Sequence, residues 1–503
     1  MLTLGTMFSA VGVPPASAAS QIAINNAIDK GLAYLNTTQL SDGRWQDNGF
    51  PVASTAMAVL AFENSPGPGH LPDNLADPYH TTVARGLDWL LSVATVTPLS
   101  VQPAGNPDSN GNGIGIYLGT YQPYETPMVL MAIVASQNQA RIATTGPVGV
   151  IGRNYKDIAT DIVDFLAFAQ EDNTTGIFEG GWRYFANFGS SDNSVTGWPI
   201  LGLRAAELWG INAPAFVKPE LQKWLTASQI LTGDYISNYF YGSFDYVPGA
   251  GFNSMVESAT GVLGLSYCGV QTSDPRVLAV EGYMVRDWNT MSGWRQNFGD
   301  LYAMYGVMKA MRETQPSPTQ FIRNYTGFPT IEWYNGTNQY ADYLVNGQYL
   351  DGHWYGPNNP DSAGGFNLDT AWATLILEFV PVKVNYKLTV TVLDAVTGDP
   401  IIGAAVLAEG PETRSGNTGG DGKILFDAIQ AGNYQVSATA SGHLPSGPQT
   451  VSVISDTEIT IRLLPSIDQV IPEVPIGPIA ASASMIIALL GFLALPRLRK
   501  KIH

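Results

Sequence analysis

The stretch QLSDGRW, residues 39–45, decides the fold, because the chain repeats its layout as QYLDGHW at residues 348–354. In both stretches a Gln is followed by Asp-Gly and, one residue later, by Trp, and a Tyr-Leu pair precedes the Gln. Repetition within a chain is typical of repeat architectures. Variants of the same layout predict six helices of one kind, near residues 21–38, 80–94, 155–170, 213–229, 276–288 and 337–348.

A second kind of stretch alternates with the first. Each begins with Thr or a substitute and continues as an apolar run, at residues 54–62, 125–133, 195–203, 259–267, 300–308 and 369–377. Helices that are hydrophobic on nearly all sides are buried, whereas the amphipathic helices of the first kind should be outer ones. Such pairs can form a linear solenoid or close into a double ring. Loops rich in aromatic residues favour the closed ring.

The repeated motif resembles that of a known superfamily. The pattern Gly-x2-Tyr-Leu-x3-Gln-x3-Gly-x-Trp, from Gly31 to Trp45, resembles the QW repeat of squalene and oxidosqualene cyclases, relatives of protein prenyltransferase β subunits. Residues 180–198, GGWRYFANFGSSDNSVTGW, are similar to repeats of secreted prenyltransferase/squalene-oxidase-repeat proteins. The resemblance implies an all-α (α/α)6 toroid of six helical hairpins over residues 21–381. In that family the Gln caps the neighbouring inner helix and the Trp stacks against it.

The catalytic residues of the superfamily are not retained along with the repeated motif. Class II cyclases protonate an alkene with the middle carboxyl of Asp-x-Asp-Asp-Thr-Ala. The nearest match, FNLDTA at residues 366–371, retains Asp369 but has Leu368 in the position of the acid. Prenyltransferases need an Asp, Cys and His zinc set, and the single cysteine, Cys268, has no His nearby in the sequence. Neither activity is expected, and no metal or cofactor is predicted.

Acidic and aromatic residues recur at the starts of the predicted inner helices. In a toroid these starts gather around one end of a central funnel, so the acidic residues are candidate catalytic residues: Glu125, Asp192, Glu257, Asp300 and Asp369. The aromatic residues are candidate ligand-binding residues: Tyr124, Trp198, Trp294, Tyr302 and Trp372. A carboxylate pair can act as acid and base on a glycan. Asp at a helix start can equally cap backbone N–H groups, and binding without catalysis is a third possibility.

The loop at residues 104–115, AGNPDSNGNGIG, contains half of a calcium-binding motif. Asp108, Asn110, Asn112 and Gly113 match positions one, three, five and six of an EF-hand loop. Position twelve, which needs a bidentate Glu, falls on Gly119. The missing Glu favours a turn-rich loop without a metal.

Residues 384–464 have a different hydrophobic pattern from the helical repeats. Apolar and polar residues alternate between turn signals, so about seven strands of a β-sandwich are expected. The stretches VLDAVTGDPIIGAAV and TGGDGKILFDAIQAGNYQVSATASGH resemble the carboxypeptidase regulatory-like, transthyretin-like domain. The resemblance implies a spacer or binding unit without catalysis.

Both ends of the chain predict export and anchoring. Residues 1–18 end in Ala-Ser-Ala and are interpreted as a signal peptide. After a linker at 465–475, residues 476–496 predict one transmembrane helix, and the basic tail at 497–503 is expected in the cytoplasm. The segment from PEVPIGP to the tail resembles the sorting signals of archaeal surface proteins, which implies a sorting or processing enzyme as a partner.

Composition and organisation together predict a surface protein. The net charge of −17 argues against a nucleic-acid partner. The hypothesis is an exported archaeal protein, anchored on the extracellular face of the membrane by a single C-terminal span. Its toroid would bind an apolar ligand, a glycan or a surface protein. The alternative is an extracellular enzyme that acts on a lipid or glycan through carboxylates in the funnel.

Overall fold

The computed structural model describes residues 18–47, 49–66, 69–172, 176–314, 321–322, 330–356, 366–379, 385–410, 413–430, 432–453 and 456–466. The chain divides into two compact units, one ending at Val382 and the other beginning at Lys383. Residues 1–17 of the expected signal peptide, and all of the transmembrane helix expected at 476–496, lie outside the described residues. Within the described ranges, no helix is both long and apolar enough to cross a bilayer.

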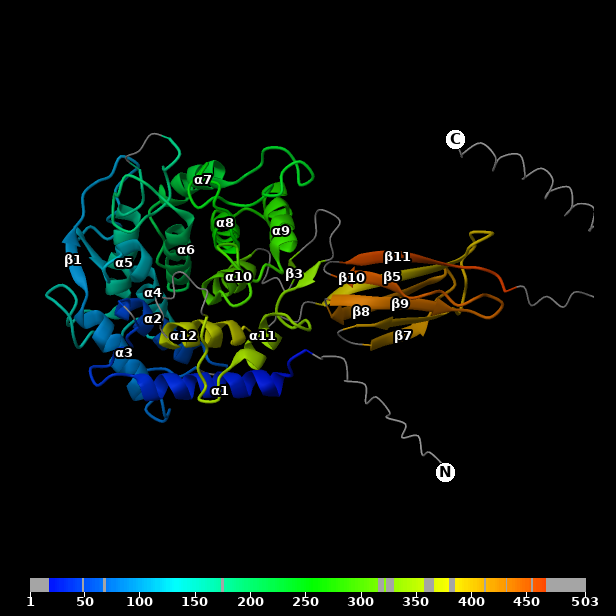
Figure 1. Ribbon diagram of the computed structural model, residues 1–503, viewed down its shortest axis with the longest axis horizontal. Helices are drawn as coiled ribbons and strands as arrows, with labels where there is room; N and C mark the ends of the chain where they lie inside the picture. The colour runs from blue at the N-terminus through cyan, green and yellow to red at the C-terminus, as the bar shows by residue number, and fades with distance from the viewer. Residues whose placement is uncertain are drawn as a thin grey trace, which may run out of the picture. The chain divides into compact units, whose positions relative to one another are not determined.

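The first unit contains twelve described helices in two concentric sets (Figure 1). The outer helices are α1 (Gln21–Thr38), α3 (His80–Ser92), α5 (Tyr155–Phe168), α7 (Val217–Ser228), α9 (Pro275–Asp287) and α11 (Tyr340–Gly347). The inner helices are α2 (Pro51–Asn64), α4 (Gln122–Ala135), α6 (Asn193–Glu207), α8 (Met255–Tyr267), α10 (Leu301–Glu313) and α12 (Phe366–Leu377). The predicted alternation of outer and inner helices is confirmed.

The inner helices form a closed ring. Each contacts the next in chain order, and α12 packs back onto α2. In α2 every residue from Val52 to Glu63 is buried, whereas α1 buries one face only. Closure gives the apolar surface of each inner helix a neighbour on both sides, and a linear solenoid would leave its two end helices without one. The toroid is therefore the arrangement that this pattern specifies.

The Gln of the repeated motif joins neighbouring outer helices. The amide nitrogen of Gln39 donates to the carbonyls of Gly43 and Thr82, at 2.8 Å each, and Thr82 lies in the first turn of α3. The last repeat is matched, since Gln348 donates to Gly352 and to Ala27 of α1. Gln170 and Gln229 make the same bridge to α7 and α9. The expectation that the Gln caps an inner helix was wrong, because its amide reaches an outer helix.

The backbone conformation of the motif explains why it contains a Gly. Gly43 has φ +101° and Gly352 has φ +100°, a region that other residues rarely adopt. A Cβ on Gly43 would lie 2.4 Å from the carbonyl oxygen of Arg85, and one on Gly352 would lie 2.3 Å from that of Lys30. The corner can therefore touch the next outer helix only if it carries no side chain.

The Trp of the motif closes the end of its own outer helix. The indole nitrogen of Trp45 donates to the carbonyl of Leu35, in the last turn of α1, at 2.7 Å. Its backbone N–H donates to the Thr55 hydroxyl at 3.0 Å, which ties the corner to α2. Trp182 and Trp354 make the equivalent pair of bonds. The Trp thus satisfies a helix-end carbonyl that would otherwise be unpaired.

Short strands complete the first unit. Strands β1 (Thr95–Pro98) and β2 (Ile114–Tyr117) form an antiparallel hairpin whose β2 lies against α5. Strands β3 (Phe321–Ile322) and β4 (Ile331–Glu332) pair between α10 and α11 in the chain. The hairpin loop is the segment that carries the calcium-like motif.

The second unit is a β-sandwich of seven described strands. Strands β10 (Gln449–Val453), β9 (Gly432–Thr439), β6 (Ala405–Glu409) and β7 (Thr413–Asn417) form one sheet in that order. Strands β11 (Thr457–Leu463), β5 (Asn385–Asp394) and β8 (Lys423–Gln430) form the other, with β11 parallel to β5. Alternate residues such as Val390 and Val436 fill the core between the sheets. The sandwich predicted from the alternation is confirmed.

Residues 18–382 are expected to fold alone. Their hydrophobic core runs from Ile24 to Phe379, and the core of the sandwich is a separate cluster from Leu388 to Leu463. A chain ending at Val382 should therefore unfold cooperatively, within a few degrees of the toroid transition in the longer protein, when followed by circular dichroism. Aggregation of this fragment, with a longer chain to Leu464 remaining stable, would contradict the boundary.

Candidate functional site

Two of the candidate carboxylates are N-caps. Asp192 Oδ1 accepts a hydrogen bond from the Val195 N–H at 2.8 Å, and Asp300 Oδ1 accepts one from the Ala303 N–H at 3.0 Å. Both side chains are buried. Carboxylates in this position satisfy the free N–H groups of a helix start and meet the favourable end of its dipole. Capping therefore accounts for the placement of both residues.

Asp192 has further partners. Its Oδ2 accepts from the Tyr246 hydroxyl at 3.2 Å and faces the Arg183 guanidinium at 3.5 Å. Burial nevertheless raises the pKa of Asp192, although the Val195 N–H, Ser194 and Arg183 all lower it. The Arg that follows the motif Trp is thus a counter-ion of the cap.

Glu125 and Glu257 lie inside the first turns of α4 and α8. Glu125 Oε1 accepts from the N–H groups of Thr120 and Tyr121, at 2.8 and 3.1 Å. Glu257 accepts from the Ser254 hydroxyl, and Ser254 accepts from the Val256 N–H. Both glutamates therefore hold the chain that enters their helix.

Asp369 differs from the other four candidates. Its side chain is fully buried, and Oδ2 accepts from the Gly356 N–H at 2.9 Å. Oδ1 is buried and receives no hydrogen bond from the described residues. Burial raises the pKa of Asp369 to about 7, and the nearby Asp47 and Asp300 carboxylates raise it further, against the opposing effect of the Gly356 N–H. Asp369 and Asp300 are thus the candidates that the fold brings into electrostatic contact.

Four of the five predicted aromatic residues meet on the toroid axis. Trp198 donates to the Tyr302 hydroxyl at 2.8 Å, and the rings of Tyr124 and Trp372 lie 6.4 and 5.5 Å from Tyr302. The fifth, Trp294, does not join them: it is 49% exposed and packs edge-on against Phe252. Its corner loop, between α9 and α10, lies outside the inner ring.

The aromatic cluster fills the axis. Trp198 also stacks on Tyr305 at 5.8 Å, and the space left beside these rings is about 20 Å³. That volume is roughly enough for one water molecule. The predicted funnel at the helix starts is therefore packed with side chains where this cluster stands.

An open cavity lies at the other ends of the inner helices. Its volume is about 740 Å³, within the usual range for small-molecule sites. The walls come from the last turns of α2, α4, α6 and α10, with an apolar part made by Leu60, Met131, Val134, Ala135, Leu201, Ala205, Leu208 and Trp209. The polar part is made by Asn64, Gln137, Arg204, Glu207, Lys309, Arg312 and Glu313.

Only one of the three cationic side chains that line this cavity forms ion pairs with described residues. Arg204 forms ion pairs with Glu207 at 3.2 Å and Glu313 at 3.4 Å. Lys309 and Arg312 form no ion pair with any described residue, and the Lys309 ammonium lies 5.9 Å from the Tyr305 ring. Burial, with a smaller contribution from Arg312, lowers the pKa of Lys309 to about 8. The Glu313 carboxylate, which pairs with Arg204, opposes this shift without forming an ion pair with Lys309.

The cavity residues were missed from the sequence. The search for chemistry followed the helix starts, whereas Lys309 and Arg312 lie near the helix end, in the stretch VMKAMRE at residues 307–313. Lys309 was the available signal, because charged residues are rare on the apolar run of an inner helix, whereas Arg312 lies on its exposed end.

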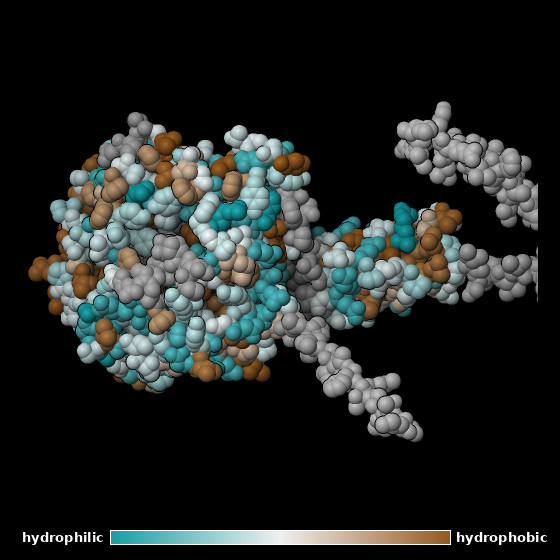
Figure 2. All heavy atoms as spheres, viewed as in Figure 1, coloured by the Kyte–Doolittle hydropathy of each residue, from teal (hydrophilic) through white to brown (hydrophobic). Residues whose placement is uncertain are grey.

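The described residues on the face drawn in Figure 2 expose their hydrophobic side chains separately. Figure 2 shows hydrophobic side chains there as small separate patches among hydrophilic ones. Single exposed apolar residues are normal on soluble domains. A search of the described residues also finds no three His, Cys, Asp or Glu side chains placed to hold a metal together.

Comparisons with known proteins identify the second unit. Residues 387–464 match the model of the carboxypeptidase regulatory-like domain, as the sequence predicted. No curated protein matches the chain.

Solved structures similar to the chain include two of a type II terpene cyclase, MstE from Scytonema. The apo form is 13% identical with a TM-score of 0.41, covering 72% of this chain and 98% of that one. A variant complex with geranylgeranyl dihydroxybenzoate is 12% identical with a TM-score of 0.42, covering 71% and 96%. A family 15 glucoamylase from Hypocrea jecorina is 11% identical with a TM-score of 0.35, covering 88% and 98%. Likeness at this level transfers no activity, and the toroid is recognised from its own closed ring.

Proposed function

We propose that the toroid is a binding module for an amphipathic anion, held in the cavity at the C-terminal ends of the inner helices. The observation that carries the proposal is Lys309, a half-buried cation beside an apolar wall that forms no ion pair with any described residue, although the Glu313 carboxylate is near it. Removing an ammonium from water is unfavourable unless an anion compensates for it. A carboxylate or phosphate on the ligand would supply that charge, and its apolar body would cover Leu60, Met131 and Leu201.

The wall chemistry favours a lipid over a glycan. Glycan sites present aromatic faces beside available carboxylates. The apolar part of this wall has one aromatic ring, Trp209, among Leu, Val, Met and Ala side chains, and the two carboxylates of the cavity, Glu207 and Glu313, pair with Arg204. Of the aromatic and acidic residues predicted from the sequence, all except Trp294 and Asp369 are engaged in axis packing or in holding helix starts. A long apolar chain with an acidic head group therefore fits the cavity best.

The proposal places this module on the outer surface of a cell membrane. The uncharged run at 476–495, followed by four basic residues, supports a single span with the toroid outside. Membrane fractionation of cells expressing the full chain, compared with a chain ending at Leu464, tests the anchor. Equal release of both chains into the soluble fraction would reject it.

Loss of the Lys309 charge should weaken binding of anionic lipids. Palmitate and a long-chain isoprenoid phosphate are the probes, and calorimetry on residues 18–382 measures their affinity. Lys309→Met should lower it by about 10- to 100-fold, because a charge-assisted bond contributes roughly 1.5–3 kcal/mol. Hexadecanol, which lacks the charge, should bind both proteins equally.

The pH dependence supplies a second readout of the same contact. Since the pKa of Lys309 is lowered to about 8, the wild type should lose affinity for palmitate as the pH rises above 8. Lys309→Arg stays charged and should remove that decline. Lys223→Met is the control, because Lys223 lies on outer helix α7 and pairs with Glu179 and Glu220. Unchanged palmitate binding by Lys309→Met would reject the proposal.

A second candidate function rests on Asp369. A buried carboxyl with a pKa near 7, a neighbouring Asp300 and an oxygen that no described residue hydrogen-bonds has the properties of a general acid or base. In an enzyme of this kind, Asp369→Asn would lower turnover by about 10²–10⁴-fold, because Asn cannot exchange the proton. The candidate needs a substrate that reaches Asp369, and a screen of lipids and surface glycans would supply the assay.

A further inference from the structure

The hairpin loop between β1 and β2 carries three ligand positions of a calcium loop, those of Asp108, Asn110 and Asn112. Asp108 Oδ1 and Oδ2 accept from the N–H groups of Gly111 and Gly113, at 2.8 and 2.9 Å. Asn110 Oδ1 accepts from the Asn112 N–H, and Asn112 Oδ1 accepts from the Ile114 N–H. The loop therefore curls so that side chains one, three and five of the motif line its inner side.

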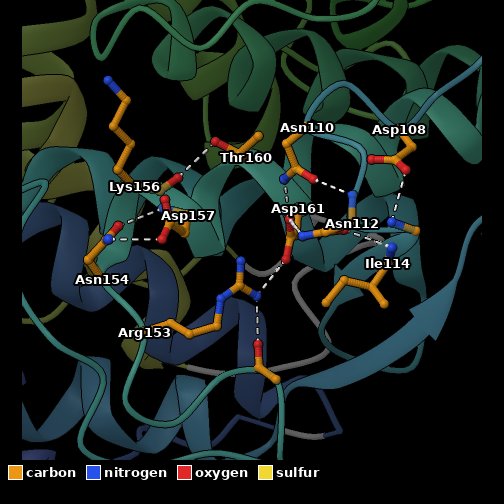
Figure 3. Close-up of polar contacts among 12 residues, drawn as sticks. Asp108, Asn110, Asn112, Ile114, Arg153, Asn154, Lys156, Asp157, Thr160 and Asp161 are labelled. Carbon is orange, nitrogen blue, oxygen red and sulfur yellow. Dashed lines mark hydrogen bonds and ion pairs between the residues drawn. The ribbon is translucent and has the colours of Figure 1, made fainter.

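The carboxylate that the loop lacks comes from α5. Asp161 Oδ1 lies 2.7 Å from the amide nitrogen of Asn110 and 2.8 Å from that of Asn112 (Figure 3). Its other oxygen, Oδ2, is 2.6 Å from the Arg153 guanidinium. Asp161 is fully buried, and its Oδ1 faces the loop. One carboxylate oxygen thus faces the loop from another part of the chain, whereas Gly119 stands at the position of the sequence where an EF-hand has its bidentate Glu.

Position seven of the motif is also suited to a cation. Ile114 lies opposite Pro98 in the hairpin, next to the pair in which the Leu99 N–H donates to the Gly113 carbonyl. Hydrogen-bonded and non-hydrogen-bonded pairs alternate along an antiparallel ladder, so the backbone groups of Ile114 point away from β1. An EF-hand uses the main-chain carbonyl at this position as a ligand. The loop residues Asn110 and Asn112 are exposed, so a cation can reach the loop from solvent.

A second carboxylate behind the loop is an independent sign of a missing positive charge. Asp164, one turn after Asp161 on α5, is fully buried, and neither of its oxygens has a partner of good hydrogen-bond geometry among the described residues. Ser109 of the loop lies beside this carboxyl, and the carboxylates of Asp161 and Asp108 are near it. Asp164 therefore lies behind the loop as a third carboxylate, not placed to bind the same ion as Asp108 and Asp161, and Arg153 faces Asp161.

We propose that this loop binds one Ca²⁺ through the carboxylates of Asp108 and Asp161, the amide oxygens of Asn110 and Asn112, and the carbonyl of Ile114. The amides would turn about χ2 to present oxygen instead of nitrogen toward Asp161, and Asp164 would add negative charge from behind. The set offers hard oxygen ligands only, and its flexible loop suits Ca²⁺ better than the smaller, strictly octahedral Mg²⁺. The site would tie the hairpin to α5.

Calorimetry with CaCl₂ on the EDTA-treated, dialysed full chain tests the proposal. One Ca²⁺ should bind per chain with a Kd of about 0.1–1 mM, the range of extracellular calcium modules, and MgCl₂ should bind at least about tenfold more weakly. No binding of Ca²⁺ at millimolar concentration would overturn the proposal, and equal affinity for Mg²⁺ would overturn the assignment to calcium.

Variants show whether the ion sits at this loop. Asp161→Asn should weaken Ca²⁺ binding at least about tenfold, since the number of ligand charges sets affinity. Because Asp161 is buried, a double variant of the exposed residues, Asn110→Ala with Asn112→Ala, repeats the test without disturbing the core. Asp157→Asn is the matched control, on the exposed face of the same helix and bonded to Asn154. Calcium binding that survives the double variant unchanged would place the ion elsewhere and overturn the proposal.

Discussion

Replacing Trp45 or Trp354 by Ala should lower the free energy of unfolding by about 3–5 kcal/mol, the range for a buried aromatic residue. Trp45 is 0% exposed and Trp354 is 3% exposed. Each change opens a cavity and leaves a helix-end carbonyl, that of Leu35 or Leu344, without its indole partner. Urea denaturation of residues 18–382, followed by circular dichroism, measures the loss.

Two further variants isolate the cause. Trp45→Phe retains most of the ring and removes only the N–H, so it should cost less than Trp45→Ala. Trp294→Ala removes a ring that is 49% exposed and should change stability by about 0.5 kcal/mol or less. Equal unfolding midpoints for Trp45→Ala, Trp354→Ala and the wild type would contradict the structural role of the motif.

The repeated motif predicted the fold because its recurring Gly and Trp positions make the same contact between successive outer helices. Trp354 packs on Gly31 of α1, where a Cβ would lie 2.9 Å from its ring. Trp45 packs in the same way on Gly86 of α3, at 3.1 Å. The Gly at the start of the motif therefore packs against the Trp ring of the preceding repeat. The Trp of the last repeat packs against the Gly of the first outer helix. A sequence that repeats both partners encodes their contact, so closure could be predicted.

The partner of the Gln could not be predicted in the same way. A Gln amide can donate to any free carbonyl, and the sequence does not say whether an inner or an outer helix offers one. The corner glycine decides, because its close approach at Gly43 brings the next outer helix, and the carbonyl of Thr82, within 2.8 Å of the amide. This contact depends on backbone geometry that no spacing of residues reveals.

The candidate site was predictable only in part. Acidic residues at helix starts were found, but whether such a residue caps, pairs or remains unsatisfied depends on neighbours distant in the chain, such as Arg183 for Asp192 and Asp47 for Asp369. The cavity depends on helix ends that meet only after closure. For the same reason Asp161 could not be linked to the loop at 104–115, which lies about fifty residues earlier in the sequence.

Asp369→Asn should stabilise the toroid at neutral pH and leave it unchanged at acidic pH. The pKa of this carboxyl is raised to about 7 in the fold, against about 3.9 in an unfolded chain. The folded state therefore holds the proton more tightly, so the wild type should lose stability as the pH rises from about 4 to 7. A shift of about three units corresponds to at most about 4 kcal/mol, which Asn would recover because it carries no charge and still accepts from Gly356.

Unfolding free energies of wild type and Asp369→Asn at pH 4, 6 and 8 measure this difference, with Asp157→Asn as an exposed control. The unfolding free energy of Asp369→Asn should exceed that of the wild type by nearly zero at pH 4 and by a few kcal/mol at pH 8. Such a result identifies Asp369 as a carboxyl that destabilises the fold when it is ionised. A residue that lowers the stability of the fold is expected to be kept for function. A helix cap is not expected to lower stability, because it stabilises its helix. If the variant is instead less stable than the wild type at every pH, the ionised Asp369 supports the fold, and its candidacy as a general acid or base ends there.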